Sequence, residues 1–458
     1  MSTLITGIGT LVTNDPHVQD GCDAGRPDPE VDGASTAAPA GPASRSGRTV
    51  SHDTDPLGQL HGAAVVIEEG RIAWVGPADH APAADDAVDL GGQTLIPGFV
   101  DSHTHPVFAG DRADEFDARM NGEKYDGGGI RRTMTATRAA SDADLHAMVT
   151  AVVNEMLRQG TTTVEGKTGY GLDVDTEVRM ARILAETVDE VTFLGAHTVP
   201  PEHSADEYVD LVCGPMLDAV REHVSWIDVF CEKGAFDAEQ SLQVLRTGKR
   251  AGLGMRLHAA QLNPSSIIAD AVELGVASID HCTFLSDTDV SAIADSHTVA
   301  TVLPAAEFST RQPYPDASRL LRAGATVALA TDCNPGTAFT SSMPFCLAVA
   351  VREMSMTPEQ ALWSATAGGA AALRRGDVGV VRPGTRADLV SVAAPSWLHL
   401  FYRPGVPLIS QVWRRGVCHQ MGAVPLPFRI AGRWRRASPP APSPRHGRVP
   451  GLSSSDSA

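Results

Sequence analysis

The stretch PGFVDSHTHPVFAGDR at positions 97–112 contains the first residues whose types and spacing can do chemistry. Asp101, His103 and His105 alternate directly after a short apolar run that follows Pro-Gly. Residues two apart in a β-strand project from the same face, so both imidazoles are expected to aim at one point. A pair of surface histidines beside a turn is the alternative interpretation of a bare His-x-His. The position at the end of an apolar strand favours a metal site.

Five of the 16 histidines and one aspartate stand where apolar, strand-like segments end. A single core histidine is usually satisfied by a backbone carbonyl, but this many at strand ends indicates a shared site. The set is His103, His105, His197, His258, His281 and Asp332.

The natural metal site uses four of these residues. Imidazole and carboxylate ligands without thiolate suit Zn²⁺ or Fe²⁺ equally and leave a position open for water. One such ion lowers the pKa of its water towards 7, which gives a hydroxide nucleophile at neutral pH. Asp332 is expected to shuttle the water's proton to the leaving nitrogen, and His281 to polarise the substrate carbonyl. The predicted ligands are His103, His105, His258 and Asp332.

Two other residues with reactive side chains, Cys333 and Lys167, are given no role in the predicted site. Cys333 directly follows Asp332, and strand alternation turns its side chain to the other face. Lys167 ends another strand-like run, where a carboxylated lysine would bridge two metal ions. No further set of strand-end ligands requires a second ion, so one metal per chain is predicted.

Alternating strand and helix patterns must position these residues. The clearest helix covers 142–159, with Leu145, Val149 and Met156 on its apolar face and Ser141 as N-cap. Eight strands that alternate with helices predict an α/β fold, a (β/α)8 barrel whose reactive groups lie at the C-terminal strand ends. The predicted strands are 99–105, 161–167, 192–199, 226–232, 255–259, 278–281, 300–305 and 326–332.

Both chain ends are predicted to combine in a small β-sandwich-like domain. Its expected elements are a strand at 2–12, a hairpin at 63–76 and strands at 376–392 and 408–419. Two segments, 15–58 and 437–458, lack the large apolar residues that offset ordering entropy, so they are predicted to be disordered. The predicted division of the chain is 1–96, 97–372, 373–436 and 437–458.

Composition and charge exclude several classes of partner. The 458 residues are 43% hydrophobic and 20% charged, as in ordinary globular proteins. A net charge of −18 argues against nucleic acid, and no apolar run approaches the roughly 18 residues of a membrane helix. The N-terminus lacks the basic region of a signal peptide. Seven cysteines without a CxxC pair indicate a reduced, cytoplasmic setting.

The ligand pattern resembles that of the amidohydrolase superfamily, with His-x-His on strand one, histidines on five and six, and aspartate on eight. A more specific resemblance is to the imidazolonepropionase family. The passages that carry it run through the whole predicted barrel: PGFVDSHTHPVFAGDRADEF, GGGIRRTMTATRAAS, GTTTVEGKTGYGL, FLGAHTVPPE, DVFCEKGAF, HAAQL, DHCTFL, VATVLPAAEF and LATDCNPGTAFTSSMP.

The resemblance implies roles for individual residues. The family's metal ligands fall on the four residues already chosen. Arg112 would pair its guanidinium with a propionate carboxylate, although a surface salt bridge is an equally good interpretation of the residue alone. Tyr170, between two glycines, would reach the ligand from a flexible turn. The implied substrate contacts are Arg112, Tyr170, His197, Gln261, Asn334, Gly336 and Thr337.

Two departures from the family's pattern stand in these passages. Some relatives have glutamate three residues after the strand-five histidine, where this chain has Gln261. A glutamine cannot act as a general base, so Gln261 is given an orienting role. The turn Lys167–Tyr170 often carries serine in the family, which is a mild change.

The resemblance implies hydrolysis of the ring amide C–N bond of 4-imidazolone-5-propanoate to N-formimidoyl-L-glutamate, in histidine degradation. Another cyclic amide hydrolase or a nucleobase deaminase of the same superfamily is the nearest alternative, and release of ammonia would reveal a deaminase. A non-catalytic metal-binding or ligand-sensing barrel is the rival from another class, although every ligand position is filled. The expected partner is a small molecule, and an apolar barrel face favours a homodimer.

Overall fold

The computed structural model of the chain describes residues 1–15, 55–122 and 129–422. Most of the segment 15–58, predicted to be disordered, lies outside the described residues. Its described end at 55–58 includes the buried Leu57. The predicted tail at 437–458 lies wholly outside the described residues.

Eight parallel strands form the central barrel sheet in the order β15-β14-β13-β12-β11-β10-β9-β8. The ends of the first and last strands meet through a parallel bridge between Thr104 and Cys333. The amide of Asp332 donates to the His103 carbonyl at 3.0 Å, so the barrel closes at the predicted ligands. The strands are β8 (Phe99–Asp101), β9 (Thr161–Lys167), β10 (Glu190–Ala196), β11 (Trp226–Cys231), β12 (Gly254–Ala259), β13 (Ser278–His281), β14 (Val299–Val302) and β15 (Val327–Leu329).

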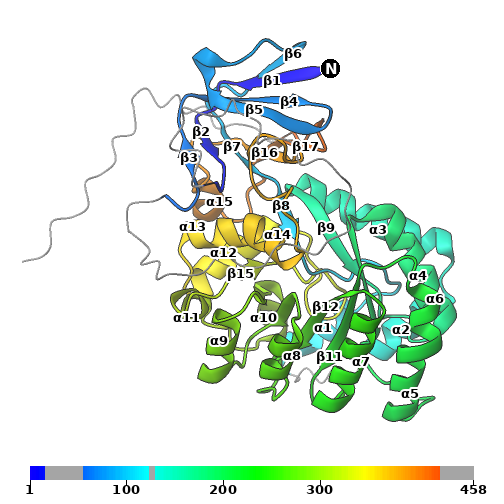
Figure 1. Cartoon of the computed structure of the whole chain (residues 1–458). Helices are drawn as coiled ribbons and strands as arrows, with labels where there is room; N and C mark the ends of the chain where they lie inside the picture. The colour runs from blue at the N-terminus through cyan, green and yellow to red at the C-terminus, as the bar shows by residue number, and fades with distance from the viewer. Residues whose placement is uncertain (16–54, 123–128, 423–458) are drawn as a thin grey trace, which may run out of the picture. The chain divides into compact units, whose positions relative to one another are not determined.

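Helices alternate with these strands and surround them (Figure 1). The predicted helix at 142–159 is confirmed as α3 (Asp142–Arg158), where the Ser141 hydroxyl accepts from the Asp144 amide at 3.2 Å. Leu145, Val149 and Met156 of its apolar face are buried. The others are α1 (Ala113–Met120), α2 (Ile130–Ala139), α4 (Val174–Thr187), α5 (Ala205–Leu211), α6 (Leu217–Val220), α7 (Ala238–Arg250), α8 (Ile268–Leu274), α9 (Asp287–Ala294), α10 (Pro304–Thr310), α11 (Ala317–Arg322), α12 (Met343–Glu353), α13 (Pro358–Trp363), α14 (Gly369–Ala372) and α15 (His399–Tyr402).

Two further sheets accompany the barrel. One has the order β5-β4-β1-β6, and the other has the order β18-β17-β16-β7-β2-β3. Antiparallel pairing of β7 with β16 joins a strand that precedes the barrel to one that follows it. The strands are β1 (Ser2–Thr6), β2 (Thr10–Val12), β3 (Gln59–Leu60), β4 (Ala63–Glu68), β5 (Arg71–Pro77), β6 (Asp86–Asp89), β7 (Thr94–Pro97), β16 (Leu389–Val392), β17 (Ile409–Arg414) and β18 (Val417–Gln420).

The predicted fold class, a (β/α)8 barrel with a small β-domain, is therefore confirmed, and so is the hairpin formed by β4 and β5. The single strand predicted at 2–12 is wrong, because Gly7 adopts a φ of 63° and the chain changes sheets there. The strand predicted at 376–392 is limited to β16, since Gly379 and Gly384 turn the chain with positive φ. The division of the chain into 1–96, 97–372 and 373–436 stays a prediction.

No helix in the described ranges is long and apolar enough to cross a membrane. The six cysteines that the structure describes are all free.

Candidate active site

The four predicted metal ligands converge at the C-terminal rim of the barrel. His103 and His105 follow β8, His258 lies on β12, and Asp332 follows β15. The Nε2 atoms of His103 and His105 are 3.4 Å apart, and Asp332 Oδ1 lies 3.5 Å and 3.6 Å from them. The rings of His103 and His258 have centroids 4.4 Å apart. All four side chains are buried, so residues far apart in sequence share one enclosed point.

The donor atoms at this point fit a metal ion. Two groups of three, His103 with His105 and Asp332 and His103 with His258 and His281, each hold their donor atoms within 4.8 Å of one another. The buried His258 Nε2 has no hydrogen-bond partner within the described residues. A buried nitrogen of this kind costs stability unless something else binds it. Nitrogen and carboxylate donors without thiolate suit zinc or iron.

Buried carboxylates behind the ligands fix the orientation of two imidazoles. Asp280 Oδ2 lies 2.8 Å from His103 Nδ1, and Asp228 Oδ2 lies 3.0 Å from His258 Nδ1. Burial alone would raise the pKa of Asp280, but Arg256 and His103 hold that pKa well below its usual range. At His103 this charged acceptor keeps the proton on Nδ1 and leaves Nε2 to face the metal position. Asp228 lies against His258 as an ion-pair partner without hydrogen-bond geometry. These two carboxylates, which the sequence analysis missed, are therefore part of the site.

Two other histidines at the rim stay neutral near pH 7. Burial lowers the pKa of both His197 and His281 to about 3. His197 Nδ1 lies 2.9 Å from the Gly169 carbonyl, so its proton sits there and Nε2 can accept. The His197 ring stacks on His105 with centroids 5.5 Å apart. Neutral imidazoles can donate or accept single hydrogen bonds without adding charge to the site.

Asp332 is held in a backbone conformation that few residues adopt. Its φ of 54° lies in the left-handed region, as does the φ of 84° at His281. Thr337 Oγ1 donates to Asp332 Oδ2 at 3.1 Å, and Asn334 Nδ2 donates to the Asp332 carbonyl at 2.6 Å. Asn334 and Thr337 therefore position Asp332, and their direct contact with substrate stays a prediction.

Arg112 forms a salt bridge, as one interpretation of the sequence expected, but it is buried and faces the cavity, and its pairing with a carboxylate of the substrate stays a prediction. Its Nε and Nη2 atoms lie 2.8 Å and 2.7 Å from the two Glu115 oxygens, and its side chain also lines the cavity. A Cβ added to Gly336 would lie 2.4 Å from Arg112 Nη1, so the guanidinium packs against bare backbone. The orientation of Arg112 is thus fixed on two sides.

The turn that carries Tyr170 is not flexible, contrary to the sequence-based expectation. The buried Glu177 carboxylate accepts the amides of Gly169, Gly171 and Leu172 at 3.0, 2.8 and 2.9 Å. These bonds fix the turn after β9. Tyr170 is 3% exposed, and its ring centroid lies 5.3 Å from that of His197.

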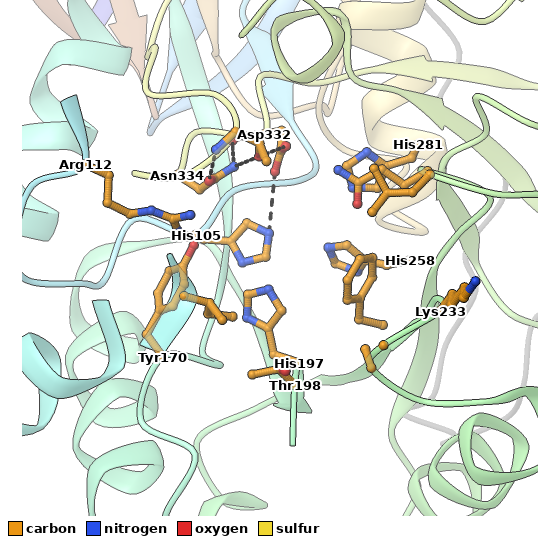
Figure 2. A pocket seen from close by; sticks show the side chains of 17 residues that line it. His105, Arg112, Tyr170, His197, Thr198, Lys233, His258, His281, Asp332 and Asn334 are labelled. Atoms are coloured by element: carbon orange, nitrogen blue, oxygen red, sulfur yellow. Dashed lines mark hydrogen bonds and ion pairs between the residues drawn. The ribbon is translucent and has the colours of Figure 1, made fainter. Parts of the chain in front are cut away.

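A cavity of about 130 Å³ is lined by most of the predicted residues, although the fully buried ligand candidate His103 lies outside its lining (Figure 2). Of the predicted substrate contacts, Gly336 alone does not line the cavity; its backbone packs against the guanidinium of Arg112. Gln261 lines the cavity from a loop whose Leu262 amide donates to Glu232 at 3.0 Å. Lys233 also lines the cavity, and the sequence analysis did not single it out. The one sequence feature that could have indicated it is its position just after the end of β11. The lining consists of His105, Arg112, Ile130, Tyr170, His197, Thr198, Phe230, Lys233, Gly234, Ala235, His258, Gln261, Leu262, His281, Asp332, Asn334 and Thr337.

Cys333 and Lys167 lie away from the cavity, as the alternation predicted for the cysteine. Cys333 packs with Val152, Met156 and Val164 behind the barrel. Lys167 is fully buried inside the barrel and pairs with acidic side chains.

Comparisons of the sequence with known proteins agree on one family. Residues 94–418 match the model of the amidohydrolase family. The chain is 64% identical over 416 residues to an imidazolonepropionase of Cutibacterium acnes, with 91% of this chain and 96% of the relative covered. It is 57% identical over 417 residues to an imidazolonepropionase of Streptomyces avermitilis, with 91% and 96% covered.

Solved structures share the fold. A variant of the atrazine chlorohydrolase of Arthrobacter aurescens, complexed with zinc and atraton, gives a TM-score of 0.64 at 16% identity, over 93% of this chain and 97% of that chain. An adenosine deaminase of Xanthomonas campestris with bound zinc gives 0.62 at 20% identity, over 92% and 94%. At these identities the likeness concerns the fold alone.

Proposed function

Because this chain belongs to the imidazolonepropionases of the amidohydrolase family, we infer that it hydrolyses the ring amide C–N bond of 4-imidazolone-5-propanoate. The product is N-formimidoyl-L-glutamate, and the reaction is a step of L-histidine degradation. The observation that carries this inference is the 64% identity over 91% of the chain, combined with a buried His3Asp set at the barrel rim.

One metal ion, zinc or iron, is proposed for the donor set of His103, His105, His258 and Asp332. When bound, such an ion lowers the pKa of water and polarises a carbonyl oxygen. The residues present fit this ion, because their buried donor atoms converge and His258 Nε2 otherwise lacks a partner within the described residues.

Asp332 is proposed as the proton carrier of the reaction. Its carboxylate lies at the ligand cluster, and burial is outweighed there by His103 and His281, which hold its pKa below the usual value. An ionised carboxylate can accept the proton of the attacking water and later deliver it to the leaving nitrogen. Thr337 and Asn334 keep that carboxylate in one orientation during both transfers.

His281 is proposed to polarise the substrate carbonyl. Its ring centroid lies 5.5 Å from that of His258 and 5.7 Å from that of His103, so it borders the same point. With a pKa of about 3 it is neutral, and it assists by hydrogen bonding rather than by charge.

Recognition of the substrate's propionate is assigned to Arg112. Glu115 holds the guanidinium plane in place before substrate arrives, which reduces the ordering cost of a bidentate contact. Tyr170 and His197 line the cavity beside each other and would orient the planar ring (Figure 2). Gln261, which also lines the cavity, would orient the ligand from its own loop.

The test is a turnover assay on freshly generated 4-imidazolone-5-propanoate with zinc-loaded protein and a chelator control. Loss of ring absorbance with N-formimidoyl-glutamate identified by mass is expected, and the chelator should abolish it. His103→Ala should lose bound metal and turnover together, whereas His146→Ala on the exposed face of α3 should lose neither. Ammonia as product would indicate a deaminase, and tight binding without turnover would indicate a sensing barrel.

The setting of this activity is also a proposal. Free cysteines fit a reduced cytoplasmic compartment, and the net charge of −18 fits a protein that does not bind nucleic acid. A homodimer stays a prediction.

A further inference from the structure

Directly beneath the metal ligands, the barrel interior holds a fully buried group of charged residues. Lys167 Nζ lies 2.8 Å from Glu165 Oε1, 2.9 Å from Asp228 Oδ2 and 3.9 Å from Asp280 Oδ2. Arg256 Nη2 lies 3.4 Å from Asp280 Oδ2. We call these five residues the interior charge group. Each of them has a fully buried side chain.

Three members of this region could themselves hold a cation. Donor atoms of Asp228, His258 and Asp280 lie within 4.8 Å of one another, and Asp280 Oδ1 has no hydrogen-bond partner within the described residues. The ammonium of Lys167 already lies among the acidic side chains. Arg256 cannot take its place, because Nη2 donates to the Ser102 carbonyl at 2.7 Å and Nη1 to the Ala372 carbonyl at 3.2 Å.

The charge of the buried assembly fits one divalent ion. Three carboxylates against one lysine and one arginine leave one negative charge in the interior charge group. Asp332 adds a second, and the histidines are neutral when they bind metal. One divalent ion balances this total, whereas a second would leave two buried positive charges without partners, which is costly.

We propose that Lys167 is a positioning residue whose ammonium takes the place of a second metal ion in the barrel. Its ammonium lies 2.9 Å from Asp228, which contacts His258, and it shares Asp280 with Arg256, so that Asp280 stays on His103. The lysine thereby orients two ligands and limits the chain to one metal. This inference rests on the proposed function, since it presupposes the metal held by His103, His105, His258 and Asp332.

The experiment compares the number of Zn²⁺ ions bound per chain, with Zn²⁺ alone as the probe. Native mass spectrometry and elemental analysis measure it in the wild type and in Lys167→Ala, both purified with Zn²⁺ present. The wild type should hold one ion. Lys167→Ala should hold two, because it removes the internal charge and opens space beside three carboxylates. Lys249→Ala, a surface lysine of α7, is the matched control and should hold one.

A charge-balanced variant tests whether the lost charge, rather than the lost side-chain volume, admits the second ion. Lys167→Ala with Asp228→Asn removes one charge of each sign, so it should fold and hold one ion. If the folded single variant Lys167→Ala binds one Zn²⁺ ion, the proposal is overturned. Failure of this single variant to fold in the presence of Zn²⁺ overturns it as well, since the second ion is expected to replace the ammonium. A wild type without bound zinc would instead contradict the proposed function.

Discussion

Gly336→Ala offers a sharp test of substrate recognition, because it perturbs Arg112 without touching a metal ligand. The added Cβ would lie 2.4 Å from Arg112 Nη1 and 2.8 Å from Cζ, closer than real Cβ contacts. The guanidinium must therefore shift. It is held by Glu115 at 2.7 and 2.8 Å, so its displacement also disturbs a partly buried ion pair.

The size of the effect follows from the contact that is lost. A hydrogen bond to a charged group contributes about 1.5–3 kcal/mol, which corresponds to an increase of about 10- to 150-fold in KM. The propionate is remote from the reacting bond, so kcat should change little. Steady-state kinetics on the imidazolone substrate, with metal content measured in parallel, gives both quantities.

The matched control is Gly376→Ala, where an added Cβ meets nothing within 4 Å. It should leave KM, kcat and metal content unchanged. If Gly336→Ala folds, holds its metal and keeps the wild-type KM, then Arg112 does not bind the substrate's carboxylate and the assignment is refuted.

Three further predictions concern the scaffold. Glu177→Gln should lower kcat/KM by about 10-fold at unchanged metal content, because charge-assisted bonds to the turn of Tyr170 become neutral ones; kinetics and metal analysis measure this. Asp189→Asn should lower the free energy of unfolding by about 3–5 kcal/mol in denaturant titrations, since Arg386 at 2.8 Å and the half-buried Arg414 at 2.9 Å lose their buried counter-ion. Burial by itself would raise the pKa of Asp189, but the two arginines outweigh it and hold that pKa below its usual value. The contribution of Asp189 to the free energy of unfolding is therefore complete above about pH 4 and is lost as the pH falls through the folded-state pKa. Ser141→Ala should cost about 1 kcal/mol by removing the N-cap of α3.

Each of these has an outcome that would contradict it. Wild-type kcat/KM in Glu177→Gln would mean that the turn keeps its shape without the charge. A stability difference between wild type and Asp189→Asn that persists unchanged at pH 2 would remove the ion pair as its cause. Unchanged unfolding of Ser141→Ala would show that the cap is replaced by water.

The convergence of the proposed metal ligands could be predicted because its first signal is local. In His103-Thr104-His105 the period of a strand decides that both imidazoles share a face, and no distant residue is needed for that conclusion. The later ligands followed from the alternation of strands and helices, because every parallel strand of a closed barrel delivers its C-terminal end to the same rim. The N-cap at Ser141 could be predicted for the same reason, because its hydrogen-bond partner lies three residues further along the chain.

The interior charge group could not be assigned from sequence. Glu165, Lys167, Asp228 and Asp280 were visible as polar residues within apolar runs, but a strand pattern does not say which charges on other strands lie opposite. The Tyr170 turn was misjudged for a similar reason, since its flanking glycines suggest mobility while Glu177, on the following helix, fixes it.

By itself, then, the sequence determined the barrel and the convergence of the proposed ligands at its rim, because these depend on periodicity and residue type within single segments. Tertiary structure alone decided how Asp280 and Asp228 orient the ligands, how Glu115 and Gly336 hold Arg112, and where the Lys167 ammonium lies. The physical reason is that hydrogen bonds and ion pairs act over a few ångströms in space, and closing the barrel brings residues from distant strands within that range.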